Sequence, residues 1–386
     1  MVKTVMIIAK HLIYGGTEKY TLNLVNSLVD KGISVVLVTS GGPLTSHISS
    51  NAKVFITPIS RKYRIKEITE KRILEIARIY KPQVIHTQCR TSLVCSQLAR
   101  TTLSIPLVTH EHHMYNKEDY PFIVNELNDG ADKIITIGPY TAKELIKNGL
   151  KKNKIISILN GVDVQKVLPV TEQERKLARK YFNFNEKDKV IVCLSRVEPG
   201  KGIDKLIRGF VKVSKQIPEA KLVIAGDDYW DPLKTDLNDM RIAYNLQKKL
   251  FLFPGEYNVR KYHAVADVFC YPAIAKGMAV MEAMAAGLPV VGRKTIRKPL
   301  VVENNISGLM TNPTSSYVID PDQIAEKLIY LLERISLART MGKAARERIE
   351  TKFNLENVVK KIMHTYEETI SIRHLSPSRL YRYLNQ

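Results

Sequence analysis

Hydrophobic residues in the first half of the chain fall into short runs separated by amphipathic segments. Seven runs have the length of buried strands: residues 4–9, 34–39, 53–57, 83–88, 106–111, 133–138 and 155–159. Residues 17–32 have apolar positions at helical spacing and stop at Gly32, which is typical of a helix with a glycine after its last turn. Strands that alternate with helices predict a parallel sheet with helices on both faces.

The same pattern starts again in the second half. Six further runs read as strands: residues 190–196, 221–226, 250–255, 268–273, 289–292 and 308–311. Helical patterns cover 202–217 and 278–286, and two more close the chain, at 322–335 and 338–373. The pattern therefore predicts an α/β protein of two doubly wound, Rossmann-like domains that face a cleft.

The domain boundaries follow from a change in composition. Residues 164–189 are polar, rich in charge and without strand character. We expect an N-terminal domain at 1–165, an interdomain region at 166–187 and a C-terminal domain at 188–352. The remaining residues, 353–386, are expected to form a C-terminal helix that packs back on the N-terminal domain.

The composition agrees with two ordinary globular domains. Of the 386 residues, 45% are hydrophobic and 25% are charged, and no run is long enough for a signal peptide or a membrane span. The four cysteines, Cys89, Cys95, Cys193 and Cys270, lie in apolar surroundings without metal-ligand spacing. This pattern favours free buried thiols in a reducing cytoplasm.

The charge balance is strongly basic. There are 59 lysines and arginines against 38 acidic residues, which gives a net charge of +21. Such a charge favours a polyanionic partner, either nucleic acid, an anionic membrane surface or phosphorylated substrates, and a solvated lysine-rich surface is the alternative. We expect no nucleic-acid partner, because no groove-reading helix, zinc module or aromatic-basic RNA motif occurs.

The first ligand-binding candidate is the stretch YGGTEKY, which follows the first predicted strand and begins a helix. Gly15 and Gly16 let the backbone approach a ligand, and the helix N-terminus offers unpaired amides to a phosphate. The alternative is a tight strand-to-helix turn with Thr17 as the N-cap.

The second candidate is SRVEPGKGID, which follows the first strand of the C-terminal domain. Arg196 and Lys201 on one short loop suit a diphosphate, whose leaving-group charge they can stabilise. The alternative is a pair of solvated basic residues in a basic chain.

Two more candidates are a carboxylate and a histidine cluster. Glu282 interrupts an apolar helix near its start, where it can accept bonds from ligand hydroxyls or pair with a nearby cation. In THEHHMY, His110, His112 and His113 end a strand. No second cluster completes a metal site, so a single histidine that hydrogen-bonds a substrate hydroxyl is favoured over a metal. His86 is interpreted as structural.

Taken in order, these motifs resemble those of the retaining GT-B glycosyltransferases, specifically glycosyltransferase family 4. The resemblance covers nearly the whole chain and includes GGTEKYTLNLVNSL, KPQVIHTQ, IPLVTHEHH, ILNGVD, SRVEPGKGIDKLI, KLVIAGD, ADVFCYPA, MEAMAAGLPVV and SGLM. Each motif is weak alone, and their order and spacing together are specific.

The resemblance implies a role for each candidate. The implied catalytic residues are His112, Arg196, Lys201 and Glu282, with His110 as the fallback for His112. The implied donor-binding residues are Gly15, Gly16, Arg196, Lys201, Gly277, Met278 and Glu282. The donor would be a nucleotide-diphosphate sugar, UDP- or GDP-linked, and no cofactor or metal would be needed because cationic side chains take that electrostatic role.

The sequence departs from the family pattern near the donor sugar. The first glutamate of the family's Glu-x7-Glu motif is replaced by Ile274, and a later glutamate is replaced by Leu300. An apolar side chain cannot pair with a sugar hydroxyl, and an unpaired buried hydroxyl costs about 1–3 kcal/mol. An unusual donor sugar is one explanation, such as a deoxygenated one or an anionic one met by basic side chains. Those side chains are Lys276, Arg293, Lys294, Arg297 and Lys298.

The second explanation is a weakened or silent protein that binds sugar nucleotides or phosphorylated ligands. The diphosphate-side residues are present, which favours an active enzyme. The resemblance therefore implies a metal-independent, retaining hexosyltransferase of the cytoplasm, placed by its charge at the inner membrane face. It would transfer a sugar to an envelope polysaccharide, a lipid-linked acceptor or another glycoconjugate.

Overall fold

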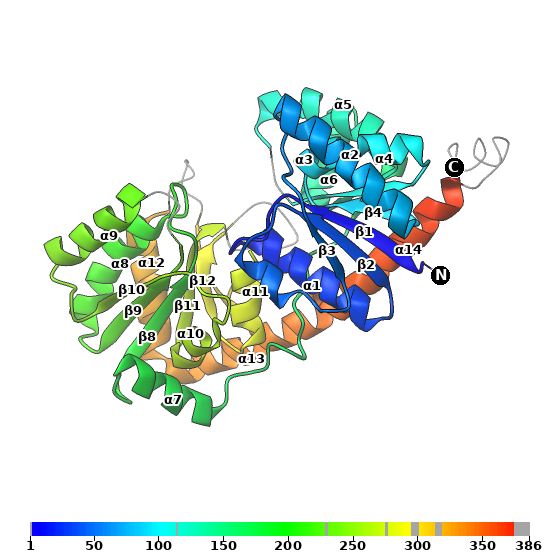
Figure 1. The fold of residues 1–386 in the computed structure, drawn as a ribbon. Helices are drawn as coiled ribbons and strands as arrows, with labels where there is room; N and C mark the ends of the chain where they lie inside the picture. The colour runs from blue at the N-terminus through cyan, green and yellow to red at the C-terminus, as the bar shows by residue number, and fades with distance from the viewer. Residues whose placement is uncertain are drawn as a thin grey trace. The chain divides into compact units, whose positions relative to one another are not determined.

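The computed structural model describes residues 2–112, 115–227, 231–274, 277–294, 301–312 and 319–373. The chain divides into two compact units (Figure 1). Unit 1 comprises Met1–Asn160 and Leu355–Gln386, and unit 2 comprises Gly161–Asn354. Each unit is built on its own parallel sheet.

Unit 1 contains seven parallel strands in the order β3-β2-β1-β4-β5-β6-β7. They are β1 (Thr4–Ala9), β2 (Ser34–Thr39), β3 (Lys53–Ile56), β4 (Val84–Thr87), β5 (Leu107–Glu111), β6 (Lys133–Thr136) and β7 (Ile155–Ser157). All seven strands predicted from the hydrophobic runs are present. In this doubly wound order the strand sequence reverses between β1 and β4, which is where such sheets place their ligands.

The helices of unit 1 cover both faces of this sheet (Figure 1). They are α1 (Gly16–Asp30), α2 (Tyr63–Tyr80), α3 (Arg90–Cys95), α4 (Gln97–Thr102), α5 (Tyr120–Gly130), α6 (Pro139–Lys147) and α14 (Leu355–Arg373), with the short 3-10 turns η1 (Pro43–His47), η2 (Lys117–Asp119) and η3 (Lys152–Lys154). Ile85 of β4 lies in the buried cluster formed with α2 to α6. The next residue, His86, points to the other face, where its Nδ1 lies 2.6 Å from the hydroxyl of Tyr366 in α14.

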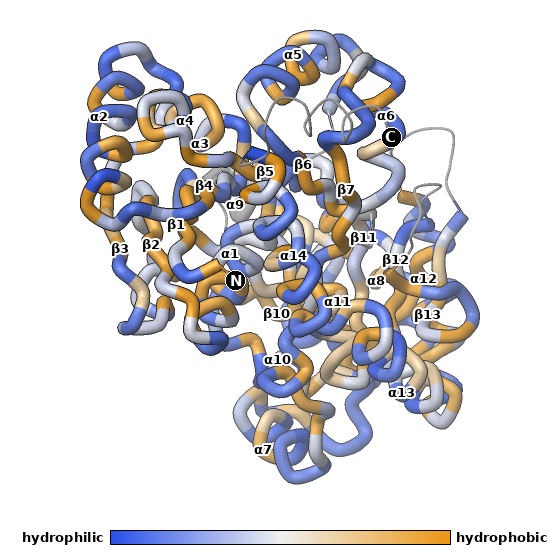
Figure 2. Tube along the Cα trace, turned by 90° about the vertical axis from the view of Figure 1, so that its right-hand side faces the viewer, coloured by the Kyte–Doolittle hydropathy of each residue, from blue (hydrophilic) through white to orange (hydrophobic). Residues whose placement is uncertain are grey.

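Gly32 ends α1 as the sequence predicts. Its φ is +77°, and its amide and that of Ile33 bond back to the carbonyls of Val29 and Leu28. This left-handed termination satisfies the last carbonyls of the helix. Along α2 and α5 the chain alternates between hydrophilic and hydrophobic positions, as expected for helices with one buried face (Figure 2).

Unit 2 contains six parallel strands in the order β10-β9-β8-β11-β12-β13. They are β8 (Lys189–Leu194), β9 (Ala220–Ala225), β10 (Leu250–Phe253), β11 (Val268–Ile274), β12 (Val290–Arg293) and β13 (Gly308–Thr311). Its helices are α7 (Glu172–Phe182), α8 (Ile203–Gln216), α9 (Asp231–Ala243), α10 (Arg260–Val265), α11 (Met278–Ala285), α12 (Pro321–Glu333) and α13 (Ile335–Lys352).

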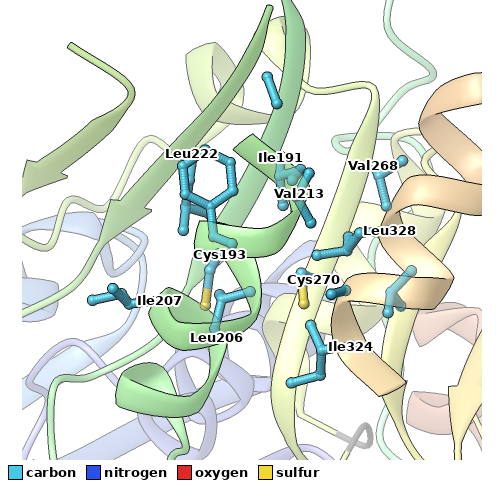
Figure 3. Close-up of a cluster of buried hydrophobic side chains, with 14 of the residues drawn as sticks. Ile191, Cys193, Leu206, Ile207, Val213, Leu222, Val268, Cys270, Ile324 and Leu328 are labelled. Atoms are coloured by element: carbon cyan, nitrogen blue, oxygen red, sulfur yellow. The ribbon is translucent and has the colours of Figure 1, made fainter. Parts of the chain in front are cut away.

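One core of unit 2 lies between the sheet and helices α8 and α12 (Figure 3). Cys193 of β8 and Cys270 of β11 point into it among aliphatic side chains, and both are free thiols. Burial raises the pKa of Cys193 to about 12. Phe269 alternates to the opposite face and contacts His263 of α10. Cys95 is also free and buried, whereas Cys89 is only half-buried, contrary to the expectation for all four cysteines.

The charge-dense segment 166–187, expected between the domains, lies within unit 2 and contains α7. This helix begins with a reciprocal capping box between Thr171 and Glu174. At the other end of the unit, the predicted helical stretch 338–373 divides into α13 and α14, so that α14 belongs to unit 1. Among the described residues, no helix is both long and apolar enough to cross a bilayer.

Candidate functional site

The loop after β8 carries the two cations that the sequence singles out. Gly200 and Gly202 have φ values of +84° and +71°, which only glycine adopts readily, and Lys201 lies between them. Gly202 is also the N-cap of α8, and a Cβ there would lie 3.2 Å from Ile319. The two glycines therefore fix the turn that leads into α8.

Glu198 brings the two cations together. Its Oε1 lies 3.2 Å from Nη2 of Arg196 and 3.1 Å from Nζ of Lys201. The charged ends of both side chains thus converge on one carboxylate oxygen. Sequence reasoning missed Glu198, although an acidic residue between two cations on a short loop is a visible signal.

The turn into α11 leaves the neighbouring strand, β11, on the same sheet edge. Gly277 is the N-cap of α11 and Met278 is its first residue. Glu282 lies in the middle of the helix and is 5% exposed. Because β8 and β11 are adjacent and parallel, both loops leave the carboxyl edge of the sheet. The structure therefore places the predicted donor-side residues of unit 2 at one edge.

Tyr271 lies between these two loops and was not predicted from the sequence. Its hydroxyl hydrogen-bonds Ser195, and it is 3.4 Å from the position a Cβ on Gly277 would take. Burial raises the pKa of Tyr271 to about 12, so the phenol stays neutral at physiological pH. A neutral hydroxyl that is bonded to Ser195 thus lies close to the start of α11.

The positions that depart from the family pattern are only partly described. Ile274 is the last residue of β11, and the pairing register with β12 shifts between Tyr271 and Ile274. Arg293 ends β12 and Lys294 follows it. The other members of this group lie outside the described residues: Lys276, Arg297, Lys298 and Leu300.

In unit 1, Gly15 and Gly16 stand at the start of α1. Gly15 is the N-cap and makes no side-chain cap, so the alternative that Thr17 caps this helix is wrong. The carboxylate of Glu18 folds back so closely that a Cβ on Gly15 would clash with it, and Nδ1 of His11 lies 3.3 Å from Glu18. A carboxylate therefore occupies the space over this helix N-terminus, where a phosphate was expected.

A cavity of about 540 Å³ opens at the carboxyl ends of β1, β4 and β5 in unit 1. Its lining residues come from the ends of these strands and the loops after them, from the first turns of α1 and α3, and from the segment before α2. They are Ala9, Lys10, His11, Thr17, Glu18, Thr21, Arg61, Gln88, Cys89, Arg90, Thr91, Glu111, His112 and Tyr115. The predicted catalytic residue His112 is thus a cavity residue, and Gly15 and Gly16 immediately precede its α1 wall.

A chain of buried hydrogen bonds fixes the orientation of His112. Nε2 of Gln88 lies 3.2 Å from Nε2 of His86, and Oε1 of Gln88 lies 3.1 Å from Nε2 of His112. An amide nitrogen only donates, so His86 accepts on Nε2 and donates from Nδ1 to Tyr366. An amide oxygen only accepts, so His112 carries its proton on Nε2.

His110, the fallback candidate, lies behind His112. The two rings stack with centroids 4.1 Å apart, and His110 is fully buried and does not line the cavity. Burial holds the pKa of His110 well below its ordinary value, and burial lowers that of His86 to about 3. Both rings are therefore neutral. The buried contacts of His86 with Tyr366 and Gln88 agree with its interpretation as a structural residue. His113 lies outside the described residues.

Glu111 is a cavity residue that sequence reasoning missed. It is 2% exposed, receives hydrogen bonds from Tyr115 and Thr109, and has its pKa raised to about 8 by burial. The nearby Arg90 opposes this rise without cancelling it. Glu111 is thus protonated at neutral pH, and the cavity has one negative charge fewer than its composition suggests.

This shift predicts a pH-dependent contribution to stability. Between pH 4.5, the ordinary pKa, and pH 8, the folded protein binds a proton on Glu111 that the unfolded chain has released. The contribution of Glu111 to the free energy of unfolding therefore falls as the pH rises through this window. We expect Glu111→Gln, which cannot ionise, to gain stability relative to the wild type between pH 5 and pH 8.5. Urea unfolding of both proteins at both pH values measures this gain. A difference in the free energy of unfolding that is the same at pH 5 and pH 8.5 would contradict the prediction.

No group of three or more His, Cys, Asp or Glu side chains suited to a metal ion occurs in the described part of the chain. Arg196 and Lys201 instead pair with Glu198 at one sheet edge, and Arg61 and Arg90 pair with Glu126 at the other. The chemistry that these edges offer is the binding of anions and hydroxyls.

Two family models match the chain. Residues 14–166 match the model described as Glycosyltransferase Family 4, and residues 174–348 match the one described as Glycosyl transferases group 1. The two matches correspond to unit 1 and unit 2 and leave only a short segment between them.

Several similar proteins have names that describe the transfer of a sugar. A Corynebacterium glutamicum GDP-mannose-dependent mannosyltransferase that acts on a monoacylated phosphatidylinositol monomannoside is 30% identical over 60% of this chain and 61% of its own. A related Mycobacterium tuberculosis mannosyltransferase is 26% identical over 62% and 63%. The alignments thus span about three fifths of these relatives. An Escherichia coli enzyme, UDP-Gal:alpha-D-GlcNAc-diphosphoundecaprenol alpha-1,3-galactosyltransferase, is 22% identical over 92% and 94%.

Solved structures show the same fold. HepE from Anabaena, in complex with UDP and glucose, superposes with a TM-score of 0.81 at 18% identity, over 95% of this chain and all of its own. A glycosyltransferase from Rickettsia africae gives 0.83 at 19% identity, over 95% and 99%. With its two Rossmann-like units, the chain has the predicted GT-B fold and belongs to the group 1 glycosyltransferase family.

Proposed function

We propose that this protein is a hexosyltransferase that moves a sugar from a nucleotide-diphosphate donor to a glycan or lipid-linked acceptor. Membership of the group 1 family supports the reaction class. The names of two relatives, one GDP-mannose-dependent and one that uses UDP-Gal, support a UDP- or GDP-linked donor. The lipid-linked acceptors in both names support the acceptor class.

The observation that carries the proposal is the convergence of Arg196 and Lys201 on Oε1 of Glu198. Two cations that already hold one anion are arranged to hold another. In our proposal the donor diphosphate takes the place of the Glu198 carboxylate. The two cations then neutralise the charge that develops on the departing nucleoside diphosphate. This electrostatic role is the one a metal would otherwise fill, and the reaction proposed here uses neither a metal nor a cofactor.

The other donor-side residues have supporting roles in the proposal. Gly277 and Met278 begin α11 close to Tyr271, where a main chain without a bulky N-cap side chain leaves room for the donor. Glu282 offers its buried carboxylate to the ribose hydroxyls. Gly15 and Gly16 offer the N-terminus of α1 to the diphosphate once Glu18 moves away.

We assign His112 to the reacting sugar. Its ring lines the cavity and its Nε2 is bonded to Gln88, and in our proposal the ring contacts a hydroxyl of the reacting sugar. We further propose that transfer retains the configuration at the anomeric carbon, as the resemblance implies. In that reaction the departing phosphate accepts the acceptor proton on the same face, and His112 holds the sugar in place.

Replacing Gln88 by leucine is expected to lower kcat about 10- to 100-fold, because His112 loses the partner that fixes its ring and its proton. The matched control is Gln97→Leu. Gln97 lies outside the cavity on α4 and donates to the carbonyls of Leu93 and Gly130. Steady-state kinetics and thermal unfolding of both variants distinguish a role of Gln88 in orienting His112 from a purely structural role. If both variants lose stability and activity equally, Gln88 is only structural.

A panel of UDP- and GDP-linked sugars tests the function itself. A donor that binds raises the melting temperature by mass action, and one that is used releases free nucleotide. We expect at least one donor to do both. A donor that binds without turnover favours the second candidate, a silent binding protein, which the apolar Ile274 at the end of β11 supports. If no donor binds, the proposal fails.

A further inference from the structure

The cavity of unit 1 has a basic wall. Lys10, Arg61 and Arg90 line it, and two carboxylates, Glu18 and Glu111, line it as well. Glu18 lies 3.3 Å from Nδ1 of His11, and Glu111 is protonated at neutral pH, as argued above. The three cationic side chains of the lining therefore face one ionised carboxylate of the lining, Glu18.

Arg90 is held rigidly in this wall. Its Nε donates to Oε2 of Glu126 at 2.7 Å, and its guanidinium carbon lies 5.6 Å from the ring centre of Tyr115 and 5.5 Å from that of Phe122. The side chain is 20% exposed. Its two terminal nitrogens make no hydrogen bond to the described residues. Arg90 is thus a preorganised fork with four unused N–H donors at a cavity wall.

The carboxylate that holds Arg90 is shared with a second arginine. Arg61 binds Glu126 through both terminal nitrogens, with Nη1 2.8 Å from Oε1 and Nη2 2.9 Å from Oε2. One carboxylate therefore faces two guanidinium groups, and the cluster keeps a net positive charge. Since the single negative charge of Glu126 faces two positive charges, one positive charge of the cluster is left for a further anion.

We propose that this cavity binds a phosphate or carboxylate group of the acceptor, through the terminal nitrogens of Arg90 and with the added charge of Arg61. The inference rests on the proposed function and specifies its acceptor as anionic. A planar fork fits either oxyanion in a two-bond arrangement. The cavity volume of about 540 Å³ is large enough for a sugar that carries such a group. Specificity follows, because a neutral acceptor does not neutralise the positive charge of the partly buried fork.

Calorimetric titration of the full-length protein with glucose 1-phosphate, glucuronate and glucose tests this inference. UDP is present at saturation, so that the donor phosphate site is filled. We expect one or both anionic probes to bind at least 10-fold more tightly than glucose. Tighter binding of glucose 1-phosphate identifies a phosphate, and tighter binding of glucuronate identifies a carboxylate. Equal binding of all three probes would overturn the inference.

Substitutions then place the anion at Arg90. Arg90→Gln is expected to weaken the preferred anionic probe about 10- to 100-fold, and Arg90→Lys to restore part of the affinity, because it keeps the charge but not the fork. Arg72→Gln is the matched control, since Arg72 is half-exposed on α2, pairs with Glu75 and does not line the cavity. Unchanged affinity in folded Arg90→Gln or Arg90→Lys protein would overturn the inference. UDP affinity, measured in the same variants, tests the donor site separately. Loss of UDP binding would show failure of the proposed function and not of this inference.

Discussion

Replacing Arg196 by alanine is expected to lower the kcat/KM of sugar transfer about 100- to 1000-fold. In other enzymes, removing one hydrogen-bond donor that stabilises a developing negative charge lowers the rate by about this factor. Here the loss is compounded, because Glu198 then shares its charge with Lys201 alone. The remaining carboxylate competes with the diphosphate for the only cation left in the pair.

The measurement is steady-state transfer with the best donor of the panel, together with the affinity for the free nucleotide. Lys212→Ala is the control, because Lys212 also lies in unit 2 but forms an exposed ion pair with Asp322. That variant should retain its activity, since exposed pairs contribute little. Nucleotide affinity and transfer that survive Arg196→Ala unchanged would refute the assignment of this loop to the diphosphate.

Replacing Asp267 by alanine is expected to lower the free energy of unfolding of unit 2 by about 3–5 kcal/mol, as the breaking of a buried ion pair does. Asp267 precedes β11 and its side chain is 8% exposed. It accepts bonds from Arg175, from Arg179 at 3.2 Å and from the amide of Val190 at 2.8 Å. Without it, the buried charge of Arg179 loses its carboxylate partner and keeps only hydrogen bonds to backbone carbonyls, and β8 loses a contact with α7.

Urea unfolding monitored by circular dichroism measures this loss. Glu75→Ala serves as the control, since Glu75 and Arg72 form an exposed pair on α2. The control should change stability by less than about 1 kcal/mol. A loss of similar size in both variants would show that the Asp267 cluster is no stronger than a surface pair.

The strands were predictable because a parallel strand is covered on both faces and its sequence is a continuous apolar run. The run 34–39 coincides with β2, for example. α7 was missed because it is charged over most of its surface and packs through few residues. Its capping box, Thr171 with Glu174, was nevertheless readable in the sequence.

The candidate site was only partly predictable. Arg196 and Lys201 were found because both stand in one short loop after a strand. The partners of Arg90 and His86 were not found, because each is created by the fold: Glu126 lies 36 residues from Arg90, and Tyr366 lies 280 residues from His86. The spacing of residues along the chain does not reveal pairs that are so far apart in the sequence. Burial likewise decides that Glu111 is protonated, and a single sequence gives no direct measure of it.

The bond between His86 and Tyr366 has a consequence for the order of synthesis. Unit 1 is a discontinuous domain, since its last helix, α14, is translated only after all of unit 2. While the ribosome is still making unit 2, the nascent unit 1 lacks the helix that shields one side of β5. Unit 2 can complete its core first, and unit 1 reaches its final state only once residue 366 has left the exit tunnel.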